Sequence, residues 1–320
     1  MKTRILPLTS VGSFPKPDYV LKARKQYPAG HPDRKKLERR ATKFWIEIQE
    51  SLNYDILVHG EMERGDMVAY FGETLGGLEP GNPKEPVRAY GNRFWIPPEI
   101  KGRVFWKGPM TVESWKYAQS ITSKPVKGML TGPGTIYDWS IDIYYGNRRR
   151  ALKDIAQALR EEIKALISSG AKIIQIDEPS LAQAIDISYL KNVFVDMLKG
   201  LDAYFIFHTC YGEEMFKKYR DDLARLPIHN LDIETANSDM RLLNFIGQVP
   251  FDITVGLVDV HSHETESKEI VIERIRKALE TIPRNNLWLG PDCGLKTRTV
   301  QEAIDKLAII SKARDTFLKQ

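Results

Sequence analysis

The 320-residue chain contains only two cysteines, and the first has a histidine two positions before it. The stretch FHTCYG holds His208 and Cys210, and Cys293 lies in PDCG. Side chains at i and i+2 of an extended strand share a face, so His208 and Cys210 could bind one metal ion. Cys293 and Glu234 could complete a tetrahedral site, and two thiolates favour zinc over magnesium or calcium. The alternative is that both cysteines are inert core residues.

Carboxylates end two further apolar runs. Asp177 and Glu178 follow IIQI, and Glu61 follows ILVHG. An acid at the end of a buried strand is costly unless it is paired. Several acids on one rim would suit a cationic ligand group such as an amine. The alternative for each acid is an ion pair with a neighbouring arginine or lysine.

Three other side chains could take part in chemistry. His261 follows VGLVDV, with Asp259 two residues before it. A histidine near a carboxylate can give or accept a proton near neutral pH, although a structural, hydrogen-bonded histidine is the alternative. Trp139 and Arg93 could stack on a flat ligand, but a tryptophan after a strand is more often a packing residue.

Short apolar runs that end in polar or turn residues carry most of these side chains. Runs of this length, bounded by Gly, Pro or Asp, are typical of buried parallel strands. The eight runs are LTSVGS (8–13), DILVHGE (55–61), VKGMLTGP (126–133), KIIQIDEP (172–179), YFIFHTC (204–210), LDIETA (231–236), ITVGLVDVH (253–261) and LWLGPDCG (287–294).

Helical patterns separate most of these runs. Residues 149–170, 267–282 and 299–320 have apolar residues at i, i+3 and i+4 spacing, and the first ends in glycine. Eight strand–helix alternations predict an α/β fold of the TIM, or (β/α)₈, barrel type. Residues 18–54 are expected to be helical and to wrap the first strand.

One interval departs from this rhythm. An insertion at about 70–122, between the second and third strands, is expected to contain a hairpin around Pro-Pro and Lys-Gly in AYGNRFWIPPEIKGRVFW, then a short helix at 111–119. We expect the hairpin to lie on the top face of the barrel. The whole chain, 1–320, is thus predicted to be a single catalytic barrel.

The candidate residues share a position, because each lies at or just after the carboxyl end of a run. In a barrel these ends form one rim, and active sites are built there. The residues are Ser13, Glu61, Asp177, Glu178, His208, Cys210, Glu234, Asp259, His261 and Cys293.

Composition excludes several classes of function. The net charge of +5 is mild, and no basic block or aromatic–basic module indicates a nucleic-acid partner. The N-terminus lacks the apolar region of a signal peptide, and no run of about 18 apolar residues predicts a membrane span. Two cysteines cannot form a disulfide framework, so a cytoplasmic location is expected.

In eight ordered motifs, the sequence from 11 to 298 resembles cobalamin-independent methionine synthases, specifically a short form with only their C-terminal catalytic barrel. The motifs are VGSFP, LVHGEMERGDMVAYFGE, KPVKGMLTGPGTIYDWS, IIQIDEPSL, HTCY, DIETANSDM, GLVDVHS and PDCGLKTR.

This resemblance implies a zinc-dependent methyltransferase that makes methionine by methyl transfer to the zinc-bound thiolate of L-homocysteine. One zinc ion per chain would be bound by His208, Cys210, Glu234 and Cys293. A free thiol is a poor nucleophile at neutral pH, and metal binding deprotonates it. The homocysteine ligands would be Gly12, Ser13, Glu61 and Asp177, with the two acids on its amino group. His261 would be the catalytic proton donor.

The methyl donor is less clearly marked. Arg93 and Trp139 occupy folate-contact positions of the family, but Gln183 replaces a glutamate that contacts the pterin, and the family's N-terminal barrel has no counterpart. We therefore expect a methylcorrinoid donor, free or on a separate corrinoid protein. The alternative is a methyl-tetrahydrofolate or methyl-tetrahydropterin.

Three other functions stay open on the sequence alone. The chain could methylate a different small thiol, as in zinc methyltransferases of the uroporphyrinogen-decarboxylase-like superfamily, in which case Glu61 and Asp177 would have no amine to bind. A zinc hydrolase is disfavoured, because two thiolates reduce the Lewis acidity of zinc. A binding protein would hold homocysteine or a corrinoid partner without turnover.

Overall fold

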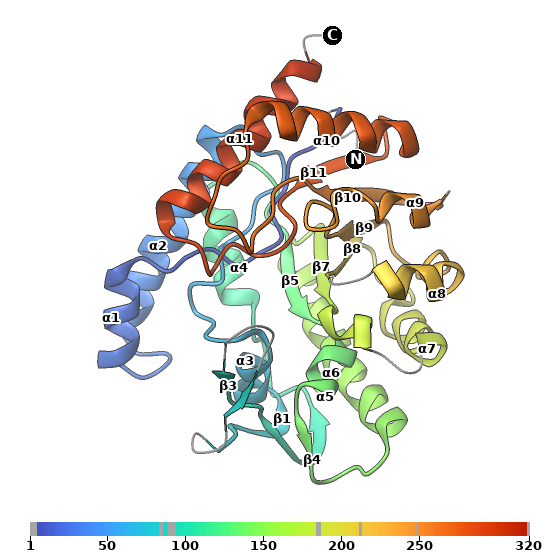
Figure 1. The fold of residues 1–320 in the computed structure, drawn as a ribbon. Coiled ribbons are helices and arrows are strands. Elements are labelled where there is room, and N and C mark those ends of the chain that lie inside the picture. Colours follow the sequence, from blue (N-terminus) through green and yellow to red (C-terminus); the bar gives the residue numbers. More distant parts are fainter. Residues whose placement is uncertain are drawn as a thin grey trace.

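The computed structural model describes residues 5–82, 86–88, 94–183, 187–210, 213–247 and 249–318 (Figure 1). The elements in chain order are α1 (Asp18–Gln26), α2 (Pro32–Ser51), α3 (Met67–Thr74), β1 (Gly76–Glu79), β2 (Val87–Arg88), β3 (Phe94–Trp95), β4 (Glu99–Phe105), α4 (Val112–Ser120), β5 (Gly128–Thr131), α5 (Pro133–Asp138), β6 (Ile141–Asp142), α6 (Arg148–Ser168), β7 (Ile173–Asp177), the 3₁₀ helix η1 (Pro179–Gln183), α7 (Ile187–Leu198), β8 (Tyr204–Thr209), α8 (Glu213–Leu223), β9 (Asn230–Ile233), α9 (Leu243–Ile246), β10 (Asp252–Gly256), α10 (Lys268–Thr281), β11 (Leu287–Gly290) and α11 (Val300–Leu318).

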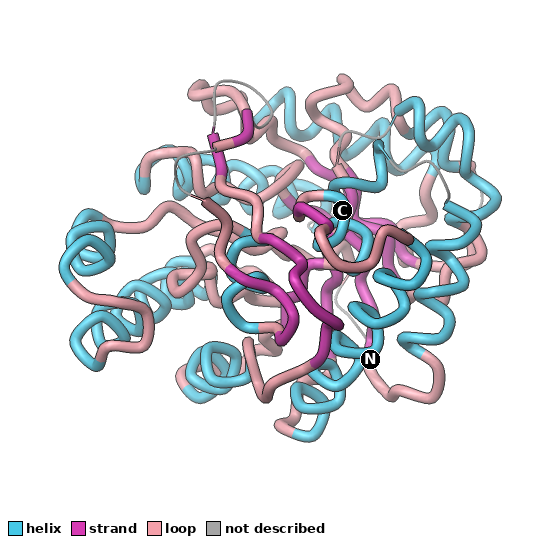
Figure 2. The backbone as a smooth tube through the Cα atoms, turned by 90° about the horizontal axis from the view of Figure 1, so that it is seen from below, coloured by secondary structure: helices cyan, strands magenta, loops and turns pink. Residues whose placement is uncertain are grey.

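Six parallel strands form one sheet in the order β5-β7-β8-β9-β10-β11. Residues 8–13 and 57–60 join its two edges to each other through three isolated parallel bridges, Leu8 with Leu289, Ser13 with Gly60, and Leu57 with Val126. The ring is therefore closed, and the strands lie at its centre with helices around them (Figure 2). The predicted barrel is confirmed, although its first two strands are reduced to single bridges.

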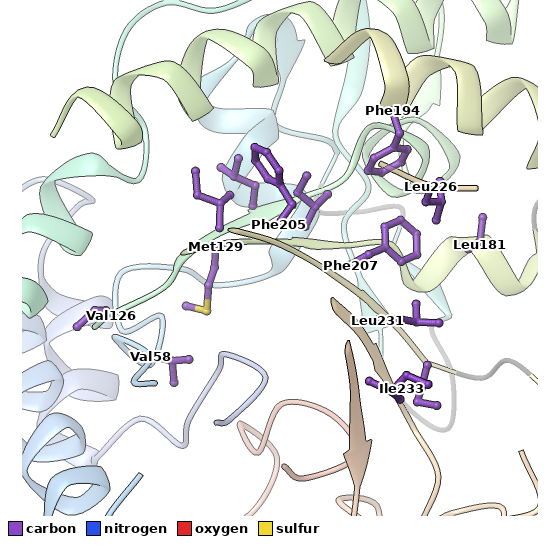
Figure 3. Packing of buried hydrophobic residues seen from close by; sticks show 14 of the residues in the cluster. Val58, Val126, Met129, Leu181, Phe194, Phe205, Phe207, Leu226, Leu231 and Ile233 are labelled. Atoms are coloured by element: carbon purple, nitrogen blue, oxygen red, sulfur yellow. The ribbon is translucent and has the colours of Figure 1, made fainter. Parts of the chain in front are cut away.

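Side chains of the barrel strands alternate between two buried environments. On β8, Phe205 and Phe207 point outward to the helices, and the Phe207 ring meets that of Phe194 on α7 at 5.2 Å (Figure 3). Ile206 and His208 have the opposite parity and point inward. Because both faces are buried, these strands are apolar over most of their length, which explains the runs in the sequence.

A separate apolar cluster plugs the amino-terminal end of the barrel interior. Ile56, Ile173, Ile206 and Trp288 form it, each at most 1% exposed. Tyr204 stacks on Trp288 with ring centroids 5.4 Å apart. Further along the strands the inward positions become polar. The interior is therefore packed with apolar side chains at one end and contains polar and charged groups towards the other.

Hydrogen bonds hold α11 against residues 52–55, which lead into the second strand. Arg314 on α11 donates to Asp55 Oδ2 at 2.7 Å, Ser311 donates to Leu52 O at 2.7 Å, and Tyr54 donates to Leu307 O at 3.2 Å. Figure 1 shows the last helix beside α2. This contact holds the segment before Glu61 in place, although that segment has little sheet pairing of its own.

The insertion differs from its prediction in where the chain turns. A hairpin was expected around Pro-Pro and Lys-Gly. Pro97 and Pro98 separate β3 from β4, and β2 pairs antiparallel with β3. Lys101 and Gly102 lie inside β4, which is continuous and pairs antiparallel with β1. Alternating residues around Lys-Gly are compatible with one continuous strand as well as with a turn.

Within the described ranges, no helix combines the length and the apolar character needed to cross a bilayer.

A buried carboxylate attaches the insertion to the barrel helices. Glu162 on α6 is 0% exposed and accepts hydrogen bonds from Trp106 Nε1, Met110 N, and both the backbone N–H and hydroxyl of Thr111, at 2.7–2.9 Å. Replacing Glu162 with alanine leaves these donors without an acceptor.

We expect Glu162→Ala to lower the free energy of unfolding by about 2–4 kcal/mol, because buried donors lose their partner. Urea denaturation measures the change. The control is Glu161→Ala on the same helix, where the side chain is 34% exposed and pairs with Lys164; it should cost less than about 0.5 kcal/mol. Equal losses in both variants would contradict this account.

Candidate active site

His208, Cys210 and Cys293 converge at the carboxyl ends of β8 and β11. One donor atom from each lies within 4.8 Å of the others. His208 and Cys210 are 2% and 3% exposed, and Cys293 is partly exposed. The i, i+2 spacing on β8 directs both of its side chains inward, as the sequence indicated.

The two cysteines and the histidine influence one another's pKa values. A hydrogen bond from Cys210, with His208 close by, holds the pKa of Cys293 well below its usual range. The thiolate at Cys293 and burial raise the pKa of Cys210. These shifts favour the thiolate at Cys293 over that at Cys210.

Asp232 orients the histidine from behind. Its Oδ1 lies 3.3 Å from His208 Nδ1, a charge contact without hydrogen-bond geometry, which leaves Nε2 for a metal. Among the described residues, neither ring nitrogen of His208 has a hydrogen-bond partner. Burial lowers the pKa of His208, but Asp232 outweighs it and holds that pKa well above 6.5. A carboxylate behind a histidine is the usual outer partner of a zinc ligand, so these residues fit a zinc ion.

Glu234, the predicted fourth ligand, is not part of this compact group. It follows β9, and its Oε1 accepts a hydrogen bond from Asn237 Nδ2 at 3.0 Å. The same oxygen lies 3.4 Å from His261 Nε2. That hydrogen-bonded contact raises the pKa of His261.

His261 meets a different carboxylate from the one its sequence neighbourhood suggested. Asp259 accepts a hydrogen bond from the backbone N–H of His261 at 2.7 Å, so it shapes the turn, while the ring faces Glu234. The His261 side chain is 33% exposed. It is the member of the site nearest to solvent in this group.

Asp292 fastens the loop that carries Glu234. It is 0% exposed and accepts backbone N–H groups of Thr235, Ala236 and Asn237 at 2.7–2.9 Å. Burial raises its pKa well above the ordinary value, and these three donors oppose that shift. Since Asp292 precedes Cys293, one residue couples the positions of two predicted ligands.

Glu61 sits in an unusual backbone conformation. Gly60 and Glu61 have φ of +85° and +58°, and the Glu61 N–H donates to His59 Nδ1 at 3.1 Å. Arg64 donates to Glu61 Oε1 at 2.8 Å and to Met129 O at 2.7 Å. The ion pair considered from the sequence is therefore present, and a left-handed non-glycine residue at this rim indicates a functional constraint.

Asp177 ends β7 beside these residues. Burial raises its pKa to about 7, against the opposing effect of His208. Gln175 Nε2 donates to Asp177 Oδ1 at 2.6 Å and to Val11 O at 2.8 Å. This one amide ties the acid to the strand that leads into Gly12 and Ser13.

Gly12 lies against Glu61, and Ser13 lies against the loop that carries Cys293. A Cβ on Gly12 would stand 3.4 Å from Glu61 Oε1 and 3.0 Å from Met129 Sδ. A Cβ on Gly294 would stand 2.2 Å from Ser13 Oγ, and Leu295 N donates to Ser13 O at 2.7 Å. The loops that carry Ser13 and Cys293 are therefore in direct contact.

The remaining predicted residues are less defined. Trp139 follows α5 and is partly buried at this end of the barrel. Arg93 and the side chain of Gln183 fall outside what the structure describes. Glu178 is 0% exposed and accepts hydrogen bonds from Gly134 N, Thr135 N and the Thr135 hydroxyl, so neutral donors satisfy it in place of the ion pair considered from the sequence.

Sequence reasoning missed Arg64, Gln175, Asp232 and Asp292 as parts of the site. Gln175 and Asp232 each stand two residues before a predicted site acid on the same strand. A period of two places both inside the barrel, so a signal for them was available. Arg64 and Asp292 lie in loops, where no periodicity applies.

Comparison with known proteins identifies the family. The pattern of the catalytic domain of cobalamin-independent synthases matches residues 6–315. The chain belongs to this family. Two curated relatives, from Bacillus licheniformis and Buchnera aphidicola, are each named 5-methyltetrahydropteroyltriglutamate–homocysteine methyltransferase. They are 40% identical over 95% and 100% of this chain, which spans 42% and 44% of their own lengths.

Solved structures agree with the barrel. A B12-independent methionine synthase from Shewanella sp. W3-18-1, in complex with selenomethionine, is 25% identical with a TM-score of 0.85. The match covers 99% of this chain and 98% of that one. A second synthase structure, from Listeria monocytogenes, has 20% identity and a TM-score of 0.78, covers 98% and 99% of the two chains, and supports the fold.

These comparisons correct the expected methyl donor. The family is defined as cobalamin-independent, and the curated relatives are named for a methylated pteroyltriglutamate. The methylcorrinoid donor and a separate corrinoid protein are thus unsupported, and the pterin alternative fits better. The prediction gave too much weight to Gln183, since a glutamine side chain still offers a hydrogen-bond donor and acceptor.

The three hydrogen bonds that Asp292 accepts can be tested directly. Asp292→Asn should lower the free energy of unfolding by about 1–3 kcal/mol, because an amide NH₂ then faces a buried backbone donor. Guanidinium denaturation measures this. Asp221→Asn, at an 84% exposed side chain, is the control and should change stability by less than about 0.5 kcal/mol. An Asp292→Asn protein as stable as the control would refute this stabilising role of Asp292.

Proposed function

We propose that this chain transfers a methyl group from a methyl-tetrahydropteroylglutamate to the thiol of L-homocysteine, giving methionine, with zinc as cofactor. The observation that carries the proposal is the convergence of His208, Cys210 and Cys293 within 4.8 Å, beside the acids Asp177 and Glu61. A soft-donor metal site next to a carboxylate pair suits an amino acid that bears a thiol. The family and the names of its relatives support the same reaction.

His208, Cys210 and Cys293 would hold the zinc ion, and Glu234 is the candidate for a further ligand. When bound there, zinc would keep the substrate thiol deprotonated and nucleophilic at neutral pH. Asp232 fixes the ring of His208, and Asp292 fixes the loop of Glu234. The protein therefore orients these ligands through buried carboxylates.

Asp177 and Glu61 would bind the substrate amino group. Arg64 engages Oε1 of Glu61, so Oε2 is the oxygen available to an ammonium. The backbone of Gly12 and the Ser13 hydroxyl, adjacent to these acids, would take the carboxylate. With acids at one end and the neutral donors of Gly12 and Ser13 at the other, this arrangement would favour an α-amino acid over a simple thiol.

His261 would supply the proton that the pterin nitrogen needs when its methyl group leaves. Its ring is partly exposed and faces Glu234, between the metal ligands and solvent. Trp139, partly buried at the same end of the barrel, would contact the flat pterin ring.

Transfer of a labelled methyl group to homocysteine tests the reaction and its donor. Zinc-loaded protein is expected to form methionine from 5-methyltetrahydropteroyltriglutamate and not from methylcobalamin. His261→Gln should lower kcat by about 10²–10⁴-fold if it is the general acid. Turnover with methylcobalamin alone would overturn the proposed donor, and no turnover with homocysteine would overturn the reaction.

Cobalt substitution tests the metal site without turnover. We expect Co²⁺ to bind the metal-free protein with one ion per chain and a thiolate-to-metal absorption band. Cys293→Ser should remove most of the band, and Asp232→Asn should weaken metal affinity about 10–100-fold while leaving the band in place. The control is Asp252→Asn, at the opposite end of the barrel strands. A band unaffected by Cys293→Ser would exclude this site.

A further inference from the structure

A lysine lies inside the barrel beneath the site. Lys127, immediately before β5, is 0% exposed. Full burial of a lysine is rare and requires partners that compensate the lost hydration. Lys127 belongs neither to the metal site nor to the residues proposed to bind the substrate amino acid, so its burial needs a separate explanation.

Lys127 is hydrogen-bonded to the residue that holds Asp177. Its Nζ donates to Gln175 Oε1, which fixes the orientation of the Gln175 amide. The other end of that amide then donates to Asp177 Oδ1 at 2.6 Å and to Val11 O at 2.8 Å. Without the lysine, Gln175 Oε1 would lose its donor, and the amide would be held through its Nε2 contacts alone.

The same cation faces the other half of the site. Asp232 and Asp177 both favour the charged form of Lys127, against burial that lowers its pKa to about 8. Asp232 is the carboxylate behind His208. Lys127 thus interacts electrostatically with both the acid that would bind the substrate amine and the acid that orients a metal ligand.

We propose that Gln175 and Lys127 are positioning residues that fix Asp177 for the amino group of the acceptor amino acid. The inference rests on the proposed function, because it assumes that the acceptor bears an amine. Gln175 links Asp177 to Val11 O, so it sets the spacing between the amine-binding acid and the Gly12–Ser13 strand. It would therefore govern recognition of the amino acid head and leave the thiol end unaffected.

Paired ligands with and without an amino group test this inference. L-Methionine and 4-(methylthio)butanoate share the thioether and the carboxylate, and only the former carries the amine. Calorimetry on metal-free protein gives their dissociation constants. Gln175→Met keeps the length and volume of the side chain but removes the amide. It should weaken the binding of L-methionine about 10–100-fold and that of the amine-free analogue less than about threefold.

Two further variants separate positioning from general damage. Lys127→Met should also raise the dissociation constant of L-methionine more than that of the amine-free analogue, since Gln175 Oε1 loses the donor that helps to fix the amide. Thr254→Val removes another buried interior hydrogen bond, to Asn230 Oδ1 at 2.9 Å, and should leave the ratio of the two dissociation constants unchanged. Thermal unfolding of each variant verifies that it is folded.

The outcomes distinguish the inference from the proposed function. Equal weakening of both ligands by Gln175→Met, or a wild-type protein that binds both ligands equally, would overturn the positioning role. Unequal weakening supports it even if methyl transfer fails. If the wild type methylates homocysteine but Gln175→Met retains the full preference for L-methionine, the proposed function survives and this inference does not.

Discussion

The site depends on charge buried at one end of a closed barrel. Inward positions are apolar at Ile173 and Ile206, and polar two residues further along the same strands, at Gln175 and His208. Charges in such an environment must be paired or held by oriented donors. The apolar plug keeps solvent out from one side, so the acids, the thiols and Lys127 interact mainly with each other. Their mutual compensation fixes their geometry.

Buried carboxylates also fix the loops above the barrel. Glu178 accepts three hydrogen bonds from the first turn of α5, and Asp292 accepts three from the loop after β9. Glu266 accepts the N–H of Asp259 at 2.6 Å and contacts Lys306 and Arg274, which steadies the turn that leads to His261. The candidate ligands stand at loop starts, so these anchors give loop residues the precision expected of strands.

Period-two and period-3.6 patterns were enough to predict the barrel and the meeting of His208, Cys210 and Cys293, because parallel strand ends must share a rim. The same patterns could not reveal that residues 8–13 and 55–61 pair through single bridges, since apolar runs do not report hydrogen bonding. Nor could they show Arg64 on Glu61 or the continuous β4, which depend on loop conformation and tertiary contact. The partner of His261 was misjudged for that reason: Asp259 is near in sequence, but Glu234 is near in space.

In the proposed function, Glu234 would connect metal binding with proton transfer. Its Oε1 contacts Asn237 and His261, and the carboxylate stands outside the compact group of the other three ligands. Movement of Glu234 towards or away from the metal would then change the electrostatic support of the His261 proton. Under this proposal, the candidate ligand that stands outside the compact group is also the carboxylate that raises the pKa of the proposed proton donor.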